Sequence, residues 1–394
     1  MRVFLSCLVC RIVTFVLHKL GRGATSMPGK VALKVKRNVL KDLSKNTKVI
    51  VVTGTNGKTT SCRILEEGLK KAGKSYFINK SGANLITGVT ASFIMNSTVT
   101  GKCKKDYAII ECDENAFKEV SRYIHCDVIL VTNVFRDQLD RYGEVTHTLN
   151  AIKESVKNLP NAIVCLDADC SLTYSMSKEI PNKIITFGVN VPFDKNAKAP
   201  EISDAKYCIF CKHEYDYTYH TYGHLGGFVC NNCGYKRPQP DFAVESVEEM
   251  KNDHSVVVAN LNGDRNIIKV NIGGAYNIYN AIGCAAALTA LGIEQKNIID
   301  AIENFNGAFG RMEHFKAGNN TVNLILVKNP AGFSQTMNFL KSIDDDFTLI
   351  LSLNDNAADG RDISWIWDVD FSGIFDKPNV KELYVTGKRC YDMA

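Results

Sequence analysis

The sequence predicts an α/β protein with a central parallel-sheet domain, a four-cysteine zinc-ribbon insert and a smaller C-terminal α/β domain. Apolar strand-like runs alternate with helical patterns over most of the 394 residues, which is typical of parallel strands joined by crossover helices. A glycine-rich segment follows the first of these runs, and two Cys-x-x-Cys pairs interrupt the alternation in the middle of the chain. A second rhythm of strands and helices begins at about residue 312 and indicates a separate core.

The alternating patterns also suggest domain boundaries. The strand-like runs of the central domain are 48–53, 107–111, 127–132 and 162–166, and its helical patterns are 61–72, 148–159, 276–291 and 296–305. The C-terminal domain shows strand-like runs at 322–327, 348–353 and 383–386 and a helical pattern at 333–343. We therefore expect an N-terminal helical segment (1–46), a central domain (47–310) that contains the insert (206–236), and a C-terminal domain (311–394).

The segment Thr-Gly-Thr-Asn-Gly-Lys-Thr-Thr at 53–60 has the composition of a phosphate-binding loop. A strand that breaks at Gly54 and reopens into a helix leaves backbone N–H groups unpaired at a helix N-terminus, where polyphosphate is favoured. Lys58 would reach the β- and γ-phosphates. An ordinary glycine-rich turn would have no packing use for the Lys-Thr-Thr that follows. The residues expected to bind ATP here are Thr55, Asn56, Gly57, Lys58, Thr59 and Thr60.

A Mg²⁺ site is expected beside this loop. The Thr59 hydroxyl group occupies the position that binds the ion in phosphate loops. Glu111 ends the next strand-like run, and the carboxyl ends of parallel strands share one edge of a sheet. We therefore expect Thr59 and Glu111 to bind Mg²⁺, whereas the alternative for Glu111 is a solvated strand end.

Two Cys-x-x-Cys pairs, Cys208 with Cys211 and Cys230 with Cys233, have 18 residues between them. This spacing matches a tetrahedral Cys₄ zinc ribbon. Four sulfur ligands leave no open position on the ion, so the expected Zn²⁺ is structural. A redox dithiol is the competing interpretation, but a redox motif would be single and would lie at a strand-to-helix junction.

The composition is that of an ordinary soluble globular protein, with 45% hydrophobic and 23% charged residues. A net charge of +5 permits an anionic substrate without requiring nucleic acid, and the insert lacks the dense basic and aromatic clustering that nucleic-acid binding would need. Single cysteines lie inside apolar runs, which indicates core residues in a reducing cytoplasm; they include Cys62, Cys126, Cys165 and Cys284.

Residues 1–17 are mostly apolar and could pass for a signal peptide or a short membrane span. Arg11 interrupts the run, and its length falls short of the roughly 20 apolar residues that a spanning helix needs. We expect an amphipathic or hydrophobic helix that either packs on the body of the protein or rests on the inner face of the membrane.

Several segments resemble the Mur ligases. The short loop form at 54–59 is similar to that of Mur ligases and folylpolyglutamate synthetases, which use ATP to make an acyl phosphate. The segment 133–143 resembles the Mur ligase stretch that lines the substrate and metal site. The segment 274–280 opens a helical pattern, where an asparagine can bond the adenine of ATP or cap the helix. Capping is the alternative for Asn277, whereas Asn280, one turn further in, is less easily explained that way and is expected to bind ATP. Arg311 resembles the Mur ligase arginine that closes on the γ-phosphate of ATP.

Taken with the Cys₄ insert, the segments 328–332 and 353–368 resemble the MurT family, the Mur ligase-like subunits of lipid II isoglutaminyl synthase. The similarity runs from about residue 2 to the end of the chain. It implies ATP-dependent amidation of the D-isoglutamyl α-carboxyl group of lipid II, with ammonia from a GatD-like class I glutamine amidotransferase. It also implies that Asp362 completes the partner's catalytic triad. The alternative is that Asp359 and Asp362 stabilise the loop around Trp365 and Trp367.

Two departures from the family pattern matter. The run Asp167-Ala-Asp-Cys170 replaces a Mur ligase Asn-x-Asp-Asp pattern, and the C-terminal domain is expected to be truncated because the family continues beyond residue 394. Two other functions stay open at this point. One is a Mur or folylpolyglutamate-type ligase that adds an amino acid, and the other is a zinc-ribbon ATPase that binds nucleic acid.

Overall fold

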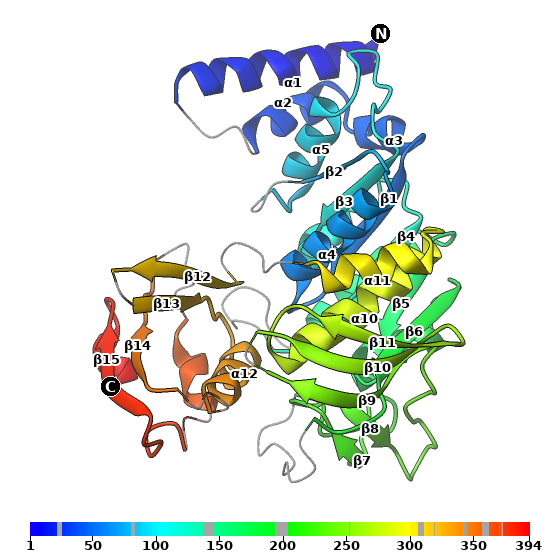
Figure 1. The fold of residues 1–394 in the computed structure, drawn as a ribbon. Helices are drawn as coiled ribbons and strands as arrows, with labels where there is room; N and C mark the ends of the chain where they lie inside the picture. Colours follow the sequence, from blue (N-terminus) through cyan, green and yellow to red (C-terminus); the bar gives the residue numbers. More distant parts are fainter. Residues whose placement is uncertain are drawn as a thin grey trace.

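The computed structural model describes residues 1–21, 26–79, 83–136, 145–193, 204–251, 253–305, 311–318, 320–341, 343, 345–356, 362–369, 371 and 373–394. The strands of its largest sheet are β1 (Lys48–Thr53), β2 (Tyr76–Ile78), β3 (Tyr107–Glu111), β4 (Val128–Val131), β5 (Ile163–Asp167), β6 (Ile184–Val189), β9 (Phe242–Met250), β10 (Ser255–Leu261) and β11 (Asp264–Val270). Their order is β11-β10-β9-β6-β5-β4-β1-β3-β2 (Figure 1). All neighbours from β2 to β9 pair in parallel, and β10 is antiparallel to β9 and β11. The predicted mostly parallel α/β sheet is confirmed.

The centre of this sheet brings three chain segments to one edge. β1 lies between β3 and β4, and the register pairs Val52 with Glu111 and Thr53 with Val131. These strands are buried, as their β-branched apolar residues require. Because the strands are parallel, the residues that follow β1, β3 and β4 meet at the carboxyl edge of the sheet.

Helices α4 (Lys58–Lys71), α10 (Ala275–Ala290) and α11 (Gln295–Glu303) pack together beside the sheet (Figure 1). Close approach of α4 to α10 depends on Gly68, where a Cβ would lie 2.5 Å from the Leu288 side chain. Other helices that the structure describes in this region are α5 (Ile86–Met95), α6 (Glu114–Val120), α8 (Val145–Lys157) and α9 (Ser171–Ser175), with a 3-10 turn, η1 (Met176–Lys178). The four cysteines expected in the core, Cys62, Cys126, Cys165 and Cys284, are buried.

The N-terminal segment forms α1 (Arg2–Lys19), α2 (Met27–Val35) and α3 (Val39–Ser44). α1 packs on α2 and α5, so this helix lies on the body of the protein, as one of the two alternatives predicts. Arg11 points inward and donates to the Ile94 carbonyl (3.1 Å) and to the Ser97 carbonyl at the end of α5. Among the described residues, no helix has both the length and the apolar character that crossing a membrane requires.

The C-terminal region has its own small core. β14 (Phe347–Ser352) and β15 (Val380–Thr386) pair in parallel, and β12 (Arg311–Ala317) and β13 (Asn320–Ile325) form an antiparallel pair. The helical elements are α12 (Pro330–Lys341), the 3-10 helix η2 (Ser364–Asp368) and α13 (Cys390–Met393). Phe333, Met337 and Trp365 form part of a buried cluster that is separate from the main core.

The insert folds as a short hairpin of β7 (Asp216–His220) and β8 (Gly226–Val229). Tyr215, Phe228 and Tyr235 form a small aromatic core beside Cys208 and Cys230. A core of this size is too small to hold a fold alone, which is the situation in which a bound metal ion is used.

Candidate functional site

The loop between β1 and α4 has the backbone geometry of a phosphate-binding loop. Gly54 and Gly57 have φ angles of 117° and 85°. A Cβ at Gly57 would lie 2.1 Å from Oδ1 of Asn280, and one at Gly54 would lie 2.4 Å from Oγ1 of Thr132. Neither position therefore accepts a side chain. α4 begins at Lys58, and the first backbone N–H groups of a helix are available to an anion.

Asn133, two residues after β4, supports this loop. Its side chain accepts a hydrogen bond from the Asn56 N–H (3.0 Å) and donates one to the Asn56 carbonyl (3.2 Å). The Thr55 hydroxyl donates to the Phe135 carbonyl (3.1 Å) and accepts from the Phe135 N–H (3.0 Å). The loop is thus held in shape by its neighbour strand, which lowers the cost of ordering it around a ligand. The rest of the 133–143 segment, from 137 on, lies outside the described residues.

Lys58 lies in a buried ion pair. Its Nζ is 2.7 Å from Oε1 of Glu114 on α6, and the two side chains are only 11% and 4% exposed. The ammonium group also donates to the Thr55 carbonyl (3.3 Å). Glu114 is a residue that sequence reasoning did not assign to the site, although it belongs to the acidic cluster that follows β3. To contact a phosphate, Lys58 would exchange part of this carboxylate contact for the ligand.

Thr59 and Glu111 lie side by side, as the parallel register predicts. The Thr59 hydroxyl donates to Oε1 of Glu111 at 3.2 Å. Asn79 fixes the backbone of Glu111 by accepting from its N–H (2.8 Å) and donating to its carbonyl (2.9 Å). A carboxylate and a hydroxyl group at the foot of a phosphate loop are hard oxygen ligands of the kind that suit Mg²⁺.

A pocket opens beside the loop. Asn56, Gly57 and Thr60 form one part of its wall, and Asn277 and Asn280 on α10 form another. Its other lining residues are Asn133, Tyr222, Ile272, Tyr276, Ile325, Leu326, Val327, Gly332, Gln335 and Thr336. Apolar and aromatic groups with a few amides are typical of a site for a nucleobase and its sugar.

The two asparagines of α10 differ in role. Asn277, in the first turn of α10, donates from its side-chain amide to the Gly273 carbonyl (2.6 Å). This is not the expected N-cap contact, in which the side chain accepts from a backbone N–H, because the N-cap residue is Gly274. Asn280 donates to Oδ1 of Asn277 (2.9 Å), and its own Oδ1 faces the space above Gly57. The adenine contact expected for Asn280 stays a prediction.

The C-terminal region contacts the loop through Asn329. This fully buried side chain donates to Oδ1 of Asn56 (2.9 Å) and accepts from the Gly332 N–H (2.8 Å) in the first turn of α12. Arg311 begins β12, but its side chain lies outside the described residues. The phosphate loop is consequently in direct contact with the C-terminal region.

Asp362 lies two residues before η2. Its Oδ1 accepts from the Ser364 N–H (2.9 Å) and the Ser364 hydroxyl (2.7 Å). This turn buries Trp365 and leaves Trp367 77% exposed. Asp359 lies outside the described residues. Asp362 is thus half-buried, and the same segment carries an exposed aromatic side chain.

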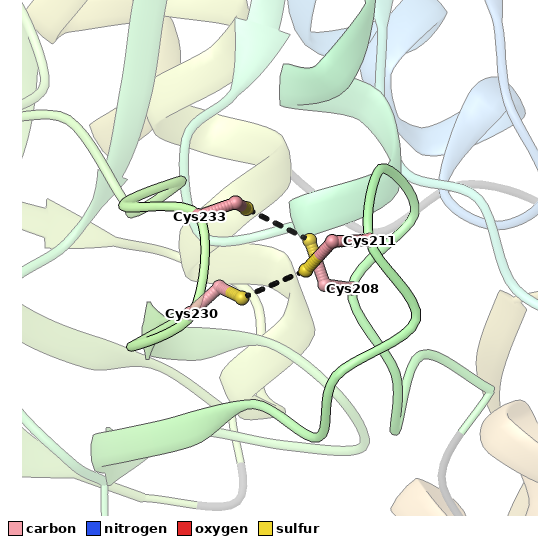
Figure 2. A group of neighbouring side chains, drawn as sticks. All are labelled: Cys208, Cys211, Cys230 and Cys233. Atoms are coloured by element: carbon pink, nitrogen blue, oxygen red, sulfur yellow. Dashed lines mark hydrogen bonds between the residues drawn. The ribbon is translucent and has the colours of Figure 1, made fainter.

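The four cysteines of the insert converge (Figure 2). Their Sγ atoms all lie within 4.8 Å of one another, with Cys208 3.6 Å from Cys233 and Cys211 3.4 Å from Cys230. Four thiolates around Zn²⁺ with Zn–S bonds of about 2.3 Å would be about 3.8 Å apart, so the cluster fits the ion. The two knuckles are formed alike, because Lys212 (φ 64°) and Gly234 (φ 74°) follow the two pairs in left-handed conformations.

The hairpin of the insert contributes to the pocket wall. Tyr222, in the turn between β7 and β8, lines the pocket and stacks on Phe135 at 5.7 Å between ring centroids. The neighbouring Thr221 hydroxyl is 2.8 Å from the Tyr279 hydroxyl on α10. Sequence reasoning missed Tyr222. The only available signal was the abundance of tyrosine in the insert, which does not say which ring points toward the sheet.

Buried polar groups join the insert to the sheet. Arg237 Nε lies 2.6 Å from Oδ1 of Asp169, and the Tyr279 hydroxyl donates to Oδ2 of the same carboxylate (2.5 Å). Burial raises the pKa of Asp169, while the Arg237 charge and the Tyr279 hydrogen bond act in the opposite direction. Asp169 therefore joins the end of the insert to α10.

Cys170 and His224 form a buried pair, with 3.3 Å between Sγ and Nε2. Burial raises the pKa of the Cys170 thiol to about 11 and lowers the pKa of His224 to about 4. Both groups are therefore neutral near pH 7, so this pair lacks the thiolate that a nucleophile needs.

Two family models match the chain. The Mur ligase middle domain matches residues 52–233, and the MurT ligase C-terminal domain matches residues 326–394. Among solved structures, a pseudomurein peptide ligase type C from Methanothermus fervidus superimposes with a TM-score of 0.62 at 25% identity over 79% of this chain and 59% of that chain. MurF from Thermotoga maritima in complex with ADP gives a TM-score of 0.59 at 14% identity over 91% of this chain and 74% of the other. The chain thus has a Mur ligase-like α/β fold, for which use of ATP and Mg²⁺ is expected.

Curated relatives identify the family within this class of Mur ligase-like proteins. The MurT subunit of lipid II isoglutaminyl synthase (glutamine-hydrolyzing) from Streptococcus pneumoniae is 36% identical over all of this chain and 86% of the relative. The MurT subunit from Staphylococcus aureus strain N315 is 32% identical over 95% of this chain and 82% of the relative. The chain belongs to the MurT family of ligases.

Proposed function

We propose that this chain is the ATP-dependent subunit that amidates the D-isoglutamyl α-carboxyl group of the lipid II stem peptide, with ammonia released from glutamine by a GatD-like class I glutamine amidotransferase. The observation that carries the proposal is the contact of Asn329 with Asn56 (2.9 Å). Asn329 belongs to the region that matches the MurT C-terminal model, and Asn56 belongs to the phosphate loop. This contact supports a single site to which both the phosphate loop and the C-terminal region contribute.

The chemistry follows from the substrate. A carboxylate is a poor electrophile, so its oxygen first attacks the γ-phosphorus of ATP, and ADP leaves. Ammonia then attacks the carbonyl carbon of the acyl phosphate, and inorganic phosphate leaves with the former carboxylate oxygen. Lys58 and the N–H groups at the start of α4 would stabilise the charge on the phosphoryl group during transfer. Arg311 is proposed to act on the same charge.

Thr59 and Glu111 would hold Mg²⁺, which would neutralise part of the phosphate charge. Their side-chain oxygens are already 3.2 Å apart, and both lie at the foot of the loop. Asn280 and Tyr222 would contact the nucleoside in the adjoining pocket. Neither assignment requires a large movement of the sheet.

The insert is proposed to be a Cys₄ zinc ribbon with a structural Zn²⁺. Four converging thiols and two matching knuckles support this assignment. Once filled by four sulfur atoms, the ion would have no open position for a substrate.

Asp362 is proposed to orient the histidine of the glutaminase partner. Two observations support this role: the Asp362 side chain is partly exposed, and the following helix η2 carries the exposed Trp367. A carboxylate is the expected orienting member of a Cys-His triad.

The test is to incubate the chain with a GatD-like partner, lipid II, ATP and glutamine, and to measure ADP and the mass of the stem peptide. We expect stoichiometric ADP and the small mass loss that exchange of a hydroxyl for an amino group causes. Stimulation of ADP release by a free amino acid without the partner would instead indicate a peptide-forming ligase.

A further inference from the structure

The outer face of α1 is an apolar surface that nothing in the described structure covers. Its large side chains are between 45% and 65% exposed, and they are Phe4, Leu5, Ile12, Phe15, Val16 and Leu20. At 100° per residue these positions fall within roughly half of the helix circumference. The buried positions of the same helix, Ser6, Cys7, Cys10 and Thr14, lie on the opposite side.

This arrangement is the reverse of an ordinary surface helix, which buries its large apolar residues. The small inner residues let α1 lie close to α2, where the Ser6 hydroxyl donates to the Ala32 carbonyl (2.8 Å). Arg11, the charge within the apolar run, is also turned inward onto the end of α5. α1 is therefore fixed to the body with its apolar face outward, at one end of the molecule (Figure 1).

The same segment concentrates positive charge. Residues 1–46 contain ten Lys and Arg against a single acidic residue, Asp42, a net charge of +9. The whole chain carries +5, so residues 47–394 carry −4. Exposed basic side chains in this segment include Arg2 and Lys19 on α1 and Lys30 and Lys34 on α2.

We propose that α1 docks the protein on the surface of an anionic lipid bilayer, with the helix lying in the plane of the interface. Apolar side chains along one face of about 27 Å of helix, in a segment with a net charge of +9, match the chemistry of such a surface. A symmetric pairing of two copies through this face would instead bring two segments of charge +9 together, which is repulsive.

Docking of this kind would keep the pocket beside the phosphate loop near a lipid-linked substrate. The proposal does not depend on the proposed function, because binding to vesicles requires neither ATP nor a partner. A protein that does not bind vesicles could still catalyse the proposed amidation, and the reverse also holds.

The experiment is co-sedimentation of the full chain with vesicles of phosphatidylcholine alone and with vesicles that also contain phosphatidylglycerol. We expect binding to the anionic vesicles that weakens as salt is raised. The double variant Ile12→Ser, Phe15→Ser should bind at least about tenfold more weakly, because it loses two apolar groups that would enter the interface. The matched control is Ile267→Ser, which replaces a 71% exposed apolar residue on β11 and should bind as the unchanged protein does.

A second variant tests the electrostatic part. Lys30→Gln, Lys34→Gln should reduce the preference for anionic vesicles while the protein keeps its thermal unfolding temperature, since both side chains are exposed. Absence of vesicle binding, or equal binding by the Ile12/Phe15 variant and the Ile267 control, would overturn the proposal. A dimer in light scattering that the Ile12/Phe15 variant abolishes would do so as well, by assigning the face to a second copy.

Discussion

Arg237 and Asp169 form a buried ion pair, 2.6 Å between Nε and Oδ1, that joins the end of the cysteine-rich insert to the carboxyl edge of the central sheet. The same carboxylate accepts from Tyr279, which precedes Asn280 on α10. One buried charge thus links the insert to the wall of the candidate nucleotide pocket. Any change that loosens the insert should therefore also disturb the pocket wall.

The variant Arg237→Ala should lower the free energy of unfolding by about 3–5 kcal/mol, because it leaves the Asp169 carboxylate buried without its charge partner. It should also weaken ADP binding, since Tyr279 and Tyr222 lose their support. The control Arg265→Ala breaks an exposed pair with Glu245 and should cost about 1 kcal/mol or less. Denaturant unfolding and calorimetric ADP titration measure the two effects, and equal stability losses in both variants would contradict the argument.

Lys58→Ala should reduce ATP turnover by about 100-fold or more, because the charge that faces the phosphates is lost. Lys70→Ala, on the same helix but 65% exposed, is the matched control and should leave turnover unchanged. The rate of ADP formation is measured for both variants. If Lys58→Ala retains its ATP turnover, the proposed role of the loop in phosphoryl transfer is contradicted.

Zinc should be present at one ion per chain when the purified protein is measured by elemental mass spectrometry. Cys230→Ser should lose it and unfold at a lower temperature, because the ribbon has only a small core without metal. Cys390→Ser, which changes a cysteine outside the cluster, should keep its zinc. Full zinc content in Cys230→Ser would show that the four thiols are not the ligands.

The lowered pKa of the buried His224 predicts that the fold loses stability in acid. In the unfolded chain its imidazole takes up a proton near pH 6.5, whereas burial lowers its pKa to about 4 in the folded protein. The unfolded state therefore binds the extra proton between these values, and stability falls as the pH drops through this window, by up to about 3 kcal/mol. His224→Gln cannot titrate, so its unfolding temperature should fall less between pH 7 and pH 4. An identical fall in both proteins would contradict the assignment.

Asp362→Asn should abolish glutamine-dependent amidation and retain activity with free ammonium, because only the partner's triad is affected. Ser364→Ala removes one of the hydrogen bonds to the Asp362 carboxylate and tests the structural alternative. If Asp362→Asn loses activity with ammonium as well as with glutamine, Asp362 would instead have a role in holding the loop around Trp365. Loss of glutamine-dependent activity in Ser364→Ala would favour the same structural role.

Local chemistry made part of this structure predictable. The strand limits 48–53 and 107–111 agree with β1 and β3, and the parallel rule places Glu111 beside Thr59. Prediction starts α4 at residue 61, whereas the helix begins at Lys58 because the left-handed Gly57 ends the loop there. The antiparallel strands β9 to β11 were not assigned from the sequence, and charged residues interrupt the apolar alternation in β9 and β11.

Contacts between distant segments could not be read from the sequence. Glu114 belongs to the site only because α6 turns it toward Lys58, and Tyr222 belongs to it only because the insert folds back onto the sheet. The inward turn of Arg11 has the same origin, since the carbonyl groups it binds are more than 80 residues away.

The central claim is that the carboxyl group is activated as an acyl phosphate, and the fate of its oxygen tests this most directly. The stem-peptide α-carboxylate would be labelled with the heavy oxygen isotope, and the complete reaction with ATP, glutamine and the partner would be analysed by mass spectrometry of the phosphate released. The account predicts one labelled oxygen in each inorganic phosphate formed with product. Unlabelled phosphate alongside amidated product would contradict it.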